Sequence, residues 1–152
     1  MKTATLTEQQ NYHSSIVVNA KANEAYNKIS HVNEWWAANF EGSAKNAGDV
    51  FTVRWGETFV TFKIADAVPG KTVTWVVTDC HLPWLKDKKE WNDTKVVFEI
   101  SEENGVTKVD MTHIGLTPEV ECYGDCETGW NHYIKKSLPK FIEEGLGVLQ
   151  KG

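Results

Sequence analysis

Residues 127–145 read ETGWNHYIKKSLPKFIEEG, and this stretch decides the fold. Its large apolar residues recur every three or four positions, which places them on one face of an α-helix. They are Trp130, Tyr133, Ile134, Leu138, Phe141 and Ile142. Gly145 predicts the end of the helix, because glycine adopts the left-handed backbone that terminates helices. Pro139 cannot bond the carbonyl one turn back, so we expect a kink there rather than a stop.

The apolar face of this helix also carries polar groups, which belong to Trp130, Tyr133 and Ser137. Such a face must be covered, and nearly all of the upstream chain has the alternating pattern of β-strands. An ordinary core helix would satisfy this pattern. A helix that closes a ligand cavity, with the polar groups along the cavity wall, would satisfy it equally well.

Composition excludes several classes of function. The chain has 152 residues, enough for one domain, and its formal net charge of −5 argues against nucleic-acid binding, which needs a basic surface. No segment has the roughly 20 apolar residues of a membrane span, and residues 1–13 lack the apolar block of a secretory signal. Three cysteines without a framework spacing predict reduced thiols in a cytoplasmic protein.

The chain before the long helix predicts one strand, two short helices and five further strands. Residues 1–10 are expected to form a flexible lead, and residues 11–146 a single domain. The first strand is predicted within residues 11–20. The two helices are predicted at Lys21–Ser30 and at Asn33–Ala38, where Asn33 could cap the second one.

The five later strands each alternate apolar and polar residues, which is typical of an antiparallel sheet with one solvated face. The residues predicted to point inward are Phe51, Val53 and Trp55, then Val60, Phe62 and Ile64, then Val73, Trp75 and Val77, then Val96, Phe98 and Ile100, and finally Val109, Met111 and His113.

Two segments lack a regular pattern. Phe40–Gly48 is predicted to be a loop, since glycines break it twice. Asp79–Asp93 is long for a structureless loop, and such loops are often functional. We interpret it as a flap near an opening; an extended hairpin, with strand ends longer than the pattern suggests, is the equal alternative.

Seven tryptophans are many for this length and indicate a large apolar interior or a binding surface built from amphipathic rings. Trp35 and Trp36 are adjacent, so on a helix they should point about 100° apart and fill different pockets. Trp84 and Trp91 lie in the predicted flap, where exposed aromatic residues often mark a contact surface.

Six segments, in this order, resemble those of a known superfamily. They are Val17–Ile29, Trp35–Trp36, Val68–Trp75, Trp91–Glu99, Thr112–Leu116 and Gly129–Gly145. The superfamily is the START-like (SRPBCC) group that includes the birch-pollen allergen, and the chain is most similar to bacterial members related to the activator of the 90-kDa heat-shock protein ATPase. The resemblance implies an α+β helix-grip fold, in which a curved antiparallel sheet of about six strands wraps around the C-terminal helix. It also implies an internal cavity for a small, usually apolar ligand.

His113 is the first candidate for chemistry. Strand alternation places it inward beside Val109 and Met111, where it could meet Tyr133 or Ser137 of the helix. An imidazole and a phenol in an apolar cavity could bind a polar head-group or move a proton, because burial shifts pKa values. A histidine that only bonds a backbone carbonyl near the strand end is the alternative.

A metal site is not expected. Cys122 and Cys126 are four residues apart, with His132 beyond them, but zinc needs three or four converging ligands. The two cysteines could share a helix face only if the helix already begins there, and Gly124 argues against that. We therefore expect reduced, partly buried thiols, and no cofactor.

Three hypotheses of function follow. The first is a cavity that binds a small hydrophobic or amphipathic molecule. Its predicted contact residues are Trp55, Phe62, Trp75, Phe98, Met111, His113, Trp130, Tyr133 and Ser137. The second is a cofactor-independent enzyme, similar to a cyclase or hydratase, that shuttles protons through His113 and Tyr133. The third is a protein that contacts a chaperone ATPase through the outer sheet or the flap.

Overall fold

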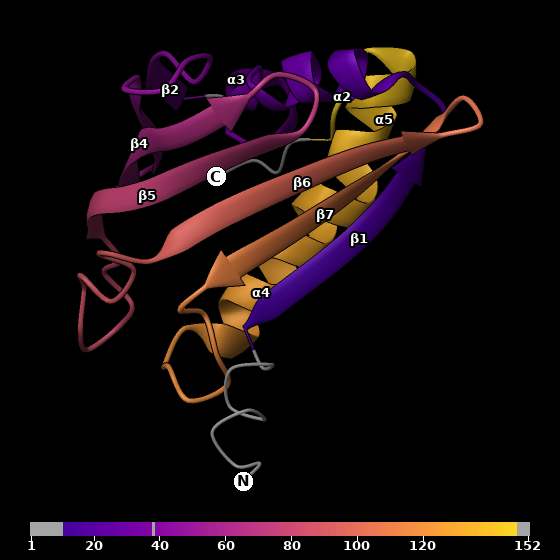
Figure 1. The fold of residues 1–152 in the computed structure, drawn as a ribbon. Helices are drawn as coiled ribbons and strands as arrows, with labels where there is room; N and C mark the ends of the chain where they lie inside the picture. Colours follow the sequence, from indigo (N-terminus) through magenta and orange to yellow (C-terminus); the bar gives the residue numbers. More distant parts are fainter. Residues whose placement is uncertain (1–10, 38, 149–152) are drawn as a thin grey trace, which may run out of the picture.

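Seven strands form one antiparallel sheet, and the C-terminal helices lie along its concave face (Figure 1). The computed structural model describes residues 11–37 and 39–148, so the predicted lead at residues 1–10 lies outside the described residues. The strands are β1 (Tyr12–Val18), β2 (Asn39–Gly42), β3 (Val50–Trp55), β4 (Thr58–Val68), β5 (Thr72–His81), β6 (Lys95–Glu103) and β7 (Val106–Ile114). The helices are α2 (Ala22–Ile29), α3 (Val32–Trp35), α4 (Tyr123–His132), η1 (Tyr133–Ser137) and α5 (Leu138–Glu144).

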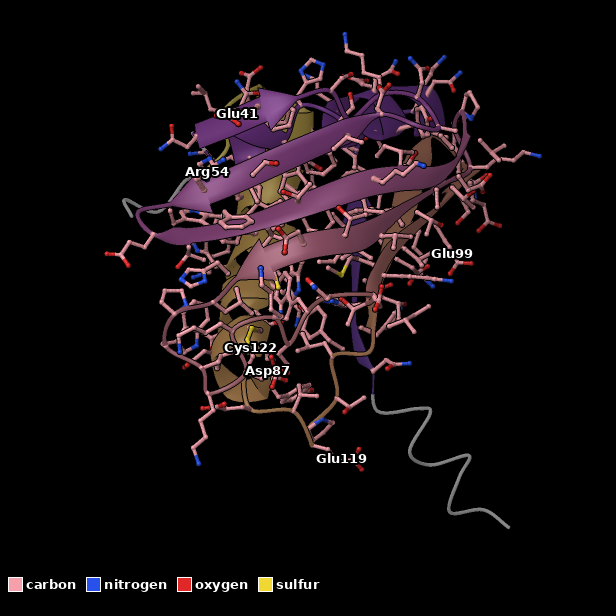
Figure 2. All side chains as sticks on the ribbon, turned by 90° about the vertical axis from the view of Figure 1, so that its left-hand side faces the viewer. Glu41, Arg54, Asp87, Glu99, Glu119 and Cys122 are labelled. Carbon is pink, nitrogen blue, oxygen red and sulfur yellow. A yellow bond between two sulfur atoms is a disulfide. The ribbon has the colours of Figure 1, made fainter. Side chains whose placement is uncertain are left out.

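The sheet has the strand order β1-β7-β6-β5-β4-β3-β2, so the first strand of the chain pairs with the last. Apolar residues on the inner face are buried, and polar residues such as Glu99 point to solvent from the outer face (Figure 2). Two register irregularities between β4 and β5 bend the strands, since a bulge adds local twist. This curved sheet around a terminal helix confirms the predicted helix-grip α+β fold.

The predicted count of about six strands is corrected to seven by β2, which lies inside the segment expected to be a loop. Its burial shows no alternation, because it is an edge strand, so periodicity gives no sign of it. Gly42 ends it with a φ of 103°, and a Cβ there would lie 2.2 Å from the Val50 carbonyl oxygen. Gly42, which the sequence pattern predicts to interrupt regular structure, therefore allows β2 to lie close to β3.

The long helix begins at Tyr123, four residues before the predicted start, and continues through Pro139. Gly145 caps it in the left-handed conformation with a φ of 81°, as predicted. The turn just before Pro139 is a π-helix, η1, in which the Leu138 N–H donates to the Tyr133 carbonyl. A wide turn of this kind accommodates Pro139, which has no backbone N–H to donate, without ending the helix.

The second short helix is a single turn, α3, rather than the predicted Asn33–Ala38, and its N-cap is His31 rather than Asn33. Trp36 therefore lies past the helix end. As a result, the rings of Trp35 and Trp36 stack with centroids 6.2 Å apart, and both pack against Trp75. The two rings therefore lie side by side, which the expectation of separate directions on one helix did not predict.

Aromatic side chains fill the space between the middle of the sheet and the helix. Trp75 lies at the centre, with edge-on contacts to Phe51, Phe62 and Phe98. All four rings are at most 1% exposed. We call this set, together with Trp35 and Trp36, the aromatic plug. Two pockets are found beside it, one bordered by Trp36 and the other by Trp75.

Candidate functional site

One end of the groove holds an apolar pocket of about 250 Å³ between α4, the β3–β4 hairpin and the loop that follows β5. We call it the aromatic pocket. Five of the seven tryptophans belong to its wall. The lining residues are Trp36, Trp55, Thr58, Val60, Leu82, Trp84, Trp91, Asp125, Cys126, Gly129, Trp130 and Tyr133. Flat rings on several sides favour a flat, mostly apolar guest.

Two polar groups in this wall are kept neutral. Burial raises the pKa of Tyr133, while a hydrogen bond with Trp55 acts in the opposite direction. The phenol therefore stays protonated at neutral pH. The indole nitrogen of Trp91 is buried and has no hydrogen-bond partner among the described residues. Both groups can orient a bound ligand by hydrogen bonding, and neither adds a charge to the pocket.

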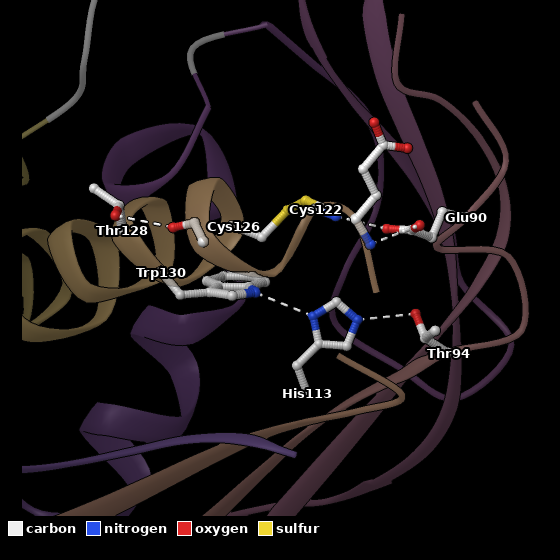
Figure 3. Close-up of a disulfide and its surroundings, with 9 residues drawn as sticks. Glu90, Thr94, His113, Cys122, Cys126, Thr128 and Trp130 are labelled. Atoms are coloured by element: carbon white, nitrogen blue, oxygen red, sulfur yellow. Dashed lines mark hydrogen bonds between the residues drawn. A yellow bond between two sulfur atoms is a disulfide. The ribbon is translucent and has the colours of Figure 1, made fainter. Parts of the chain in front are cut away.

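The loop after β5 is held in place by the start of α4 (Figure 3). One carboxylate oxygen of Glu90 accepts the Cys122 N–H at 2.9 Å, and the other accepts the Glu121 N–H at 3.2 Å. Glu121 in turn accepts the Lys86 N–H at 2.9 Å. The negative charge of Glu90 is favourable there, because the N-terminus of α4 is the positive end of the helix dipole. The segment expected to be a flap is thus a fixed wall of the pocket, and its first three residues extend β5 to His81.

Cys122 and Cys126 are joined by a disulfide, and Cys126 reaches the pocket wall (Figure 3). The expectation of reduced thiols is wrong for this pair in the structure. It rested on the odd number of cysteines without a framework spacing, and Gly124 argued against a shared helix face. In the structure, α4 already begins at Tyr123 and brings the two residues within one turn. Cys80 is free and buried, and burial raises the pKa of its thiol.

His113 points inward, as predicted, but it does not meet Tyr133 or Ser137. Its Nδ1 accepts the Trp130 indole N–H at 3.1 Å (Figure 3). Its Nε2 lies 2.9 Å from the Thr94 hydroxyl, which itself donates to the Trp91 carbonyl at 2.6 Å. The Nε2 must therefore carry the proton, and both ring nitrogens are engaged.

Complete burial lowers the pKa of His113 to about 3, so the ring is neutral at physiological pH. It lines neither the aromatic pocket nor the other pockets found among the described residues. Its ring instead contacts Trp91 edge-on, with centroids 4.6 Å apart. His113 thus aligns two tryptophans of the pocket wall, Trp91 and Trp130, from behind.

The remaining predicted contact residues divide into groups. Trp55, Trp130 and Tyr133 line the aromatic pocket together. Phe62, Phe98 and Met111 are completely buried in the core. Trp75 belongs to the plug and borders a second pocket. Ser137 is buried, and its hydroxyl donates to the Trp35 carbonyl at 2.6 Å and accepts the Val148 N–H at 2.8 Å.

Several lining residues were absent from the predicted set. Trp36 is predicted to lie on the second short helix, where helical geometry gives no sign that it faces α4. Gly129 offers no side-chain signal, although the helix stripe places it next to Trp130. Trp84 and Trp91 carried a usable signal, as aromatic residues in a charged irregular loop, and Trp84 is indeed 49% exposed.

No group of three potential ligands among the His, Cys, Asp and Glu side chains gathers within residues 11–37 and 39–148. None of the helices in the same ranges is long and apolar enough to cross a membrane.

A family model described as "Activator of Hsp90 ATPase homolog 1-like protein" matches residues 19–143. Among solved structures, the Aha1 dimer from Colwellia psychrerythraea is 22% identical, with a TM-score of 0.74 over 90% of this chain and 98% of that one. CalU16 from Micromonospora echinospora is 16% identical, with a TM-score of 0.63 over 88% of this chain and 76% of that one.

DynU16, from the dynemicin biosynthetic locus, is 13% identical, with a TM-score of 0.65 over 91% of this chain. This chain spans 49% of its length. At these identities the three structures show a shared fold. A comparison with curated proteins found no match.

Proposed function

We propose that this chain, which belongs to the family of Activator of Hsp90 ATPase homolog 1-like proteins, binds a small, flat, mostly apolar molecule in the aromatic pocket. The observation that carries the proposal is the lining: five tryptophans and Tyr133 surround one open space. Soluble proteins rarely gather so many large rings around a solvent-accessible hollow without a binding role.

The volume limits the guest. Pockets for drug-sized ligands measure about 300–1,000 Å³, and this one holds about 250 Å³. A molecule of one or two fused rings fits, whereas a lipid chain or a sterol does not, because the aromatic plug blocks the groove behind the pocket. Burial of ring surface supplies the affinity, at about 25 cal/mol per Å² before ordering costs.

Two helix glycines provide a matched test. A Cβ at Gly129 or at Gly124 would meet nothing within 4 Å, and only Gly129 lines the pocket. We expect Gly129→Leu to fill the pocket and to weaken indole or naphthalene binding at least about tenfold, while Gly124→Leu leaves it unchanged. Proton–nitrogen NMR titration measures both. Equal binding by the two variants would remove the aromatic pocket from consideration.

The enzyme hypothesis has less support. A proton shuttle would require His113 and Tyr133 to share one cavity, and His113 is fully buried with both nitrogens engaged. Tyr133 borders the aromatic pocket without a titratable histidine beside it in the lining. Binding without chemical change is therefore the function we propose for this pocket, within a cytoplasmic protein.

A second candidate is contact with a chaperone ATPase, which the family description and the filled interior favour. Helix-grip proteins with a closed interior have only their outer surfaces to offer a partner. A pull-down with the 90-kDa heat-shock protein, followed by its ATPase assay, tests this role. Capture and stimulation that persist in Gly129→Leu would support the surface role and separate it from the pocket.

A further inference from the structure

A second pocket, of about 500 Å³, is lined in part by residues of α2. Figure 1 shows α2 beside α5, at the opposite end of the C-terminal helices from α4. We call this second pocket the α2 pocket. It is bounded by α2, the segment between β2 and β3, the β4–β5 turn and the start of β5. Its lining residues are Tyr26, Asn27, Ile29, Ser30, His31, Ala44, Lys45, Asn46, Pro69, Val73 and Trp75. This volume falls within the range of pockets that hold small ligands.

The α2 pocket is independent of the aromatic pocket. The two have no lining residue in common. Trp75 borders one and Trp36 the other, and these two rings stack at 6.0 Å with an interplanar angle of 11°. The aromatic plug therefore separates two sites that can be occupied and tested one at a time.

The floor of the α2 pocket is apolar. Ile29, Val73 and Trp75 are each at most 5% exposed. The Trp75 indole nitrogen is buried and has no hydrogen-bond partner among the described residues. A floor of this kind favours the aliphatic or aromatic part of a ligand, and binding there should shift the NMR resonance of the Trp75 indole proton.

The rim, in contrast, is rich in cations and donors. Lys45 and His31 bring positive or protonatable groups, and Asn27 and Asn46 bring amides. Burial raises the pKa of Tyr26, so its phenol remains a donor at neutral pH. Donors outnumber charged acceptors in this lining, which contains no carboxylate.

Three carboxylates lie nearby, and their existing contacts matter. Asp49 accepts the Ser43 hydroxyl at 2.8 Å and the backbone N–H groups of Asn46 and Lys45 at 2.9 and 3.1 Å, so it shapes the segment that presents Lys45. The hydrogen bonds from Asn46 and Ser43 and, to a smaller extent, the charge of Lys45 lower the pKa of Asp49, so a bound carboxylate would share the Lys45 charge with Asp49. Glu34 faces His31 at 3.5 Å, and Asp66 acts on Tyr26 from a distance. No salt bridge occupies the Lys45 ammonium among the described residues.

We propose that the α2 pocket binds a small amphipathic carboxylate, whose apolar body rests on Trp75 and whose carboxylate pairs with Lys45 at the rim. Charge-assisted hydrogen bonds are the stronger kind and select the anion over a neutral isostere. The site is separate from the pocket of the proposed function, so either can fail alone.

The test uses 3-phenylpropionate and its neutral isostere 3-phenylpropionamide, titrated by proton–nitrogen NMR. We expect the acid to shift the Asn46 amide and the Trp75 indole resonances, and to bind about tenfold more tightly than the amide. Lys45→Gln should remove this difference. Lys136→Gln, an exposed change on η1, should preserve it.

Gly129→Leu separates this proposal from the first, because it blocks only the aromatic pocket. Acid binding that is unchanged in this variant supports the α2 pocket. Equal affinity for acid and amide, an unaltered affinity in Lys45→Gln, loss of acid binding in Gly129→Leu, or no binding at millimolar concentration would each overturn it. The spectra of the free variants establish that each one is folded.

Discussion

His113 has a full set of hydrogen-bond partners inside the core, and both partners are side chains rather than the backbone carbonyl that the structural alternative expected. Alternation along β7 correctly predicts that it points inward. The partner it meets depends on where the helix begins and on how the loop after β5 closes, neither of which has a periodic pattern. Trp130 and Thr94 take the two ring nitrogens, so the residue organises the pocket wall without entering the pocket.

The burial of this imidazole predicts a dependence of stability on acid. Its pKa is about 3 in the folded protein against 6.5 ordinarily, so the unfolded chain binds the proton first as pH falls. The contribution of the neutral, buried His113 to the free energy of unfolding is complete above pH 6.5 and is lost progressively below that pH. We expect the free energy of unfolding to fall by about 2 kcal/mol between pH 7 and pH 5 from this group.

Urea unfolding of the wild type and of His113→Asn at the two pH values measures this effect. The exposed pairs His13–Asp110 and His31–Glu34 occur in both proteins, so their contributions cancel in the comparison. The wild type should lose more stability on acidification than the variant. Parallel losses would mean that the pKa of His113 is the same in the folded and the unfolded protein, so that burial does not lower it.

Among the elements, the start of α4 was the least predictable and the most important for the site. The apolar stripe predicts the helix from Glu127 onward, because the first turn of α4 contains Gly124 and Asp125 and none of the large aliphatic residues of the stripe. That turn is stabilised by a side chain from a distant segment, Glu90. Tertiary contacts of this kind override local propensity and leave no trace in the local pattern. The stripe itself, the Gly145 cap and the alternating strands followed the sequence closely.

Glu90 should therefore act as a cap supplied from outside the helix. We expect Glu90→Gln to lower the free energy of unfolding by about 1 kcal/mol, because the charge at the helix N-terminus is lost while the shape is kept. It should also speed amide exchange at Cys122. Glu119→Gln is the matched control, since Glu119 is exposed in the connection before α4 (Figure 2) and forms no hydrogen bond or salt bridge within residues 11–37 and 39–148. Chemical denaturation and hydrogen exchange measure both; equal effects would attribute the change to net charge alone.

For the whole molecule, the aromatic plug turns one helix-grip groove into two small pockets. The family resemblance predicted a cavity between sheet and helix, and the alternation predicted which rings point into it. Neither could predict that these rings fill the centre, because filling depends on how Trp35, Trp36 and Trp75 stack once α3 ends early. If the chain binds a ligand as proposed, the plug rather than the size of the fold limits the size of that ligand.

This account predicts that shortening one ring of the plug joins the pockets. Trp75→Leu removes the ring that stacks on Trp36, and we expect a loss of about 3 kcal/mol in stability, which a domain of this size can tolerate. In exchange, the variant should bind the neutral ten-carbon alcohol 1-decanol, which the wild type excludes. Calorimetric titration measures the binding, and cooperative thermal unfolding shows that the variant is folded.

Phe98→Leu provides the control for that experiment. Phe98 packs against Trp75 with centroids 4.9 Å apart and is fully buried, yet it lines neither pocket. It should be destabilised to a similar degree without opening a path between the pockets. If Phe98→Leu bound 1-decanol as well as Trp75→Leu did, general loosening of the core would explain the gain. Binding confined to Trp75→Leu would show that a single indole ring separates the two sites.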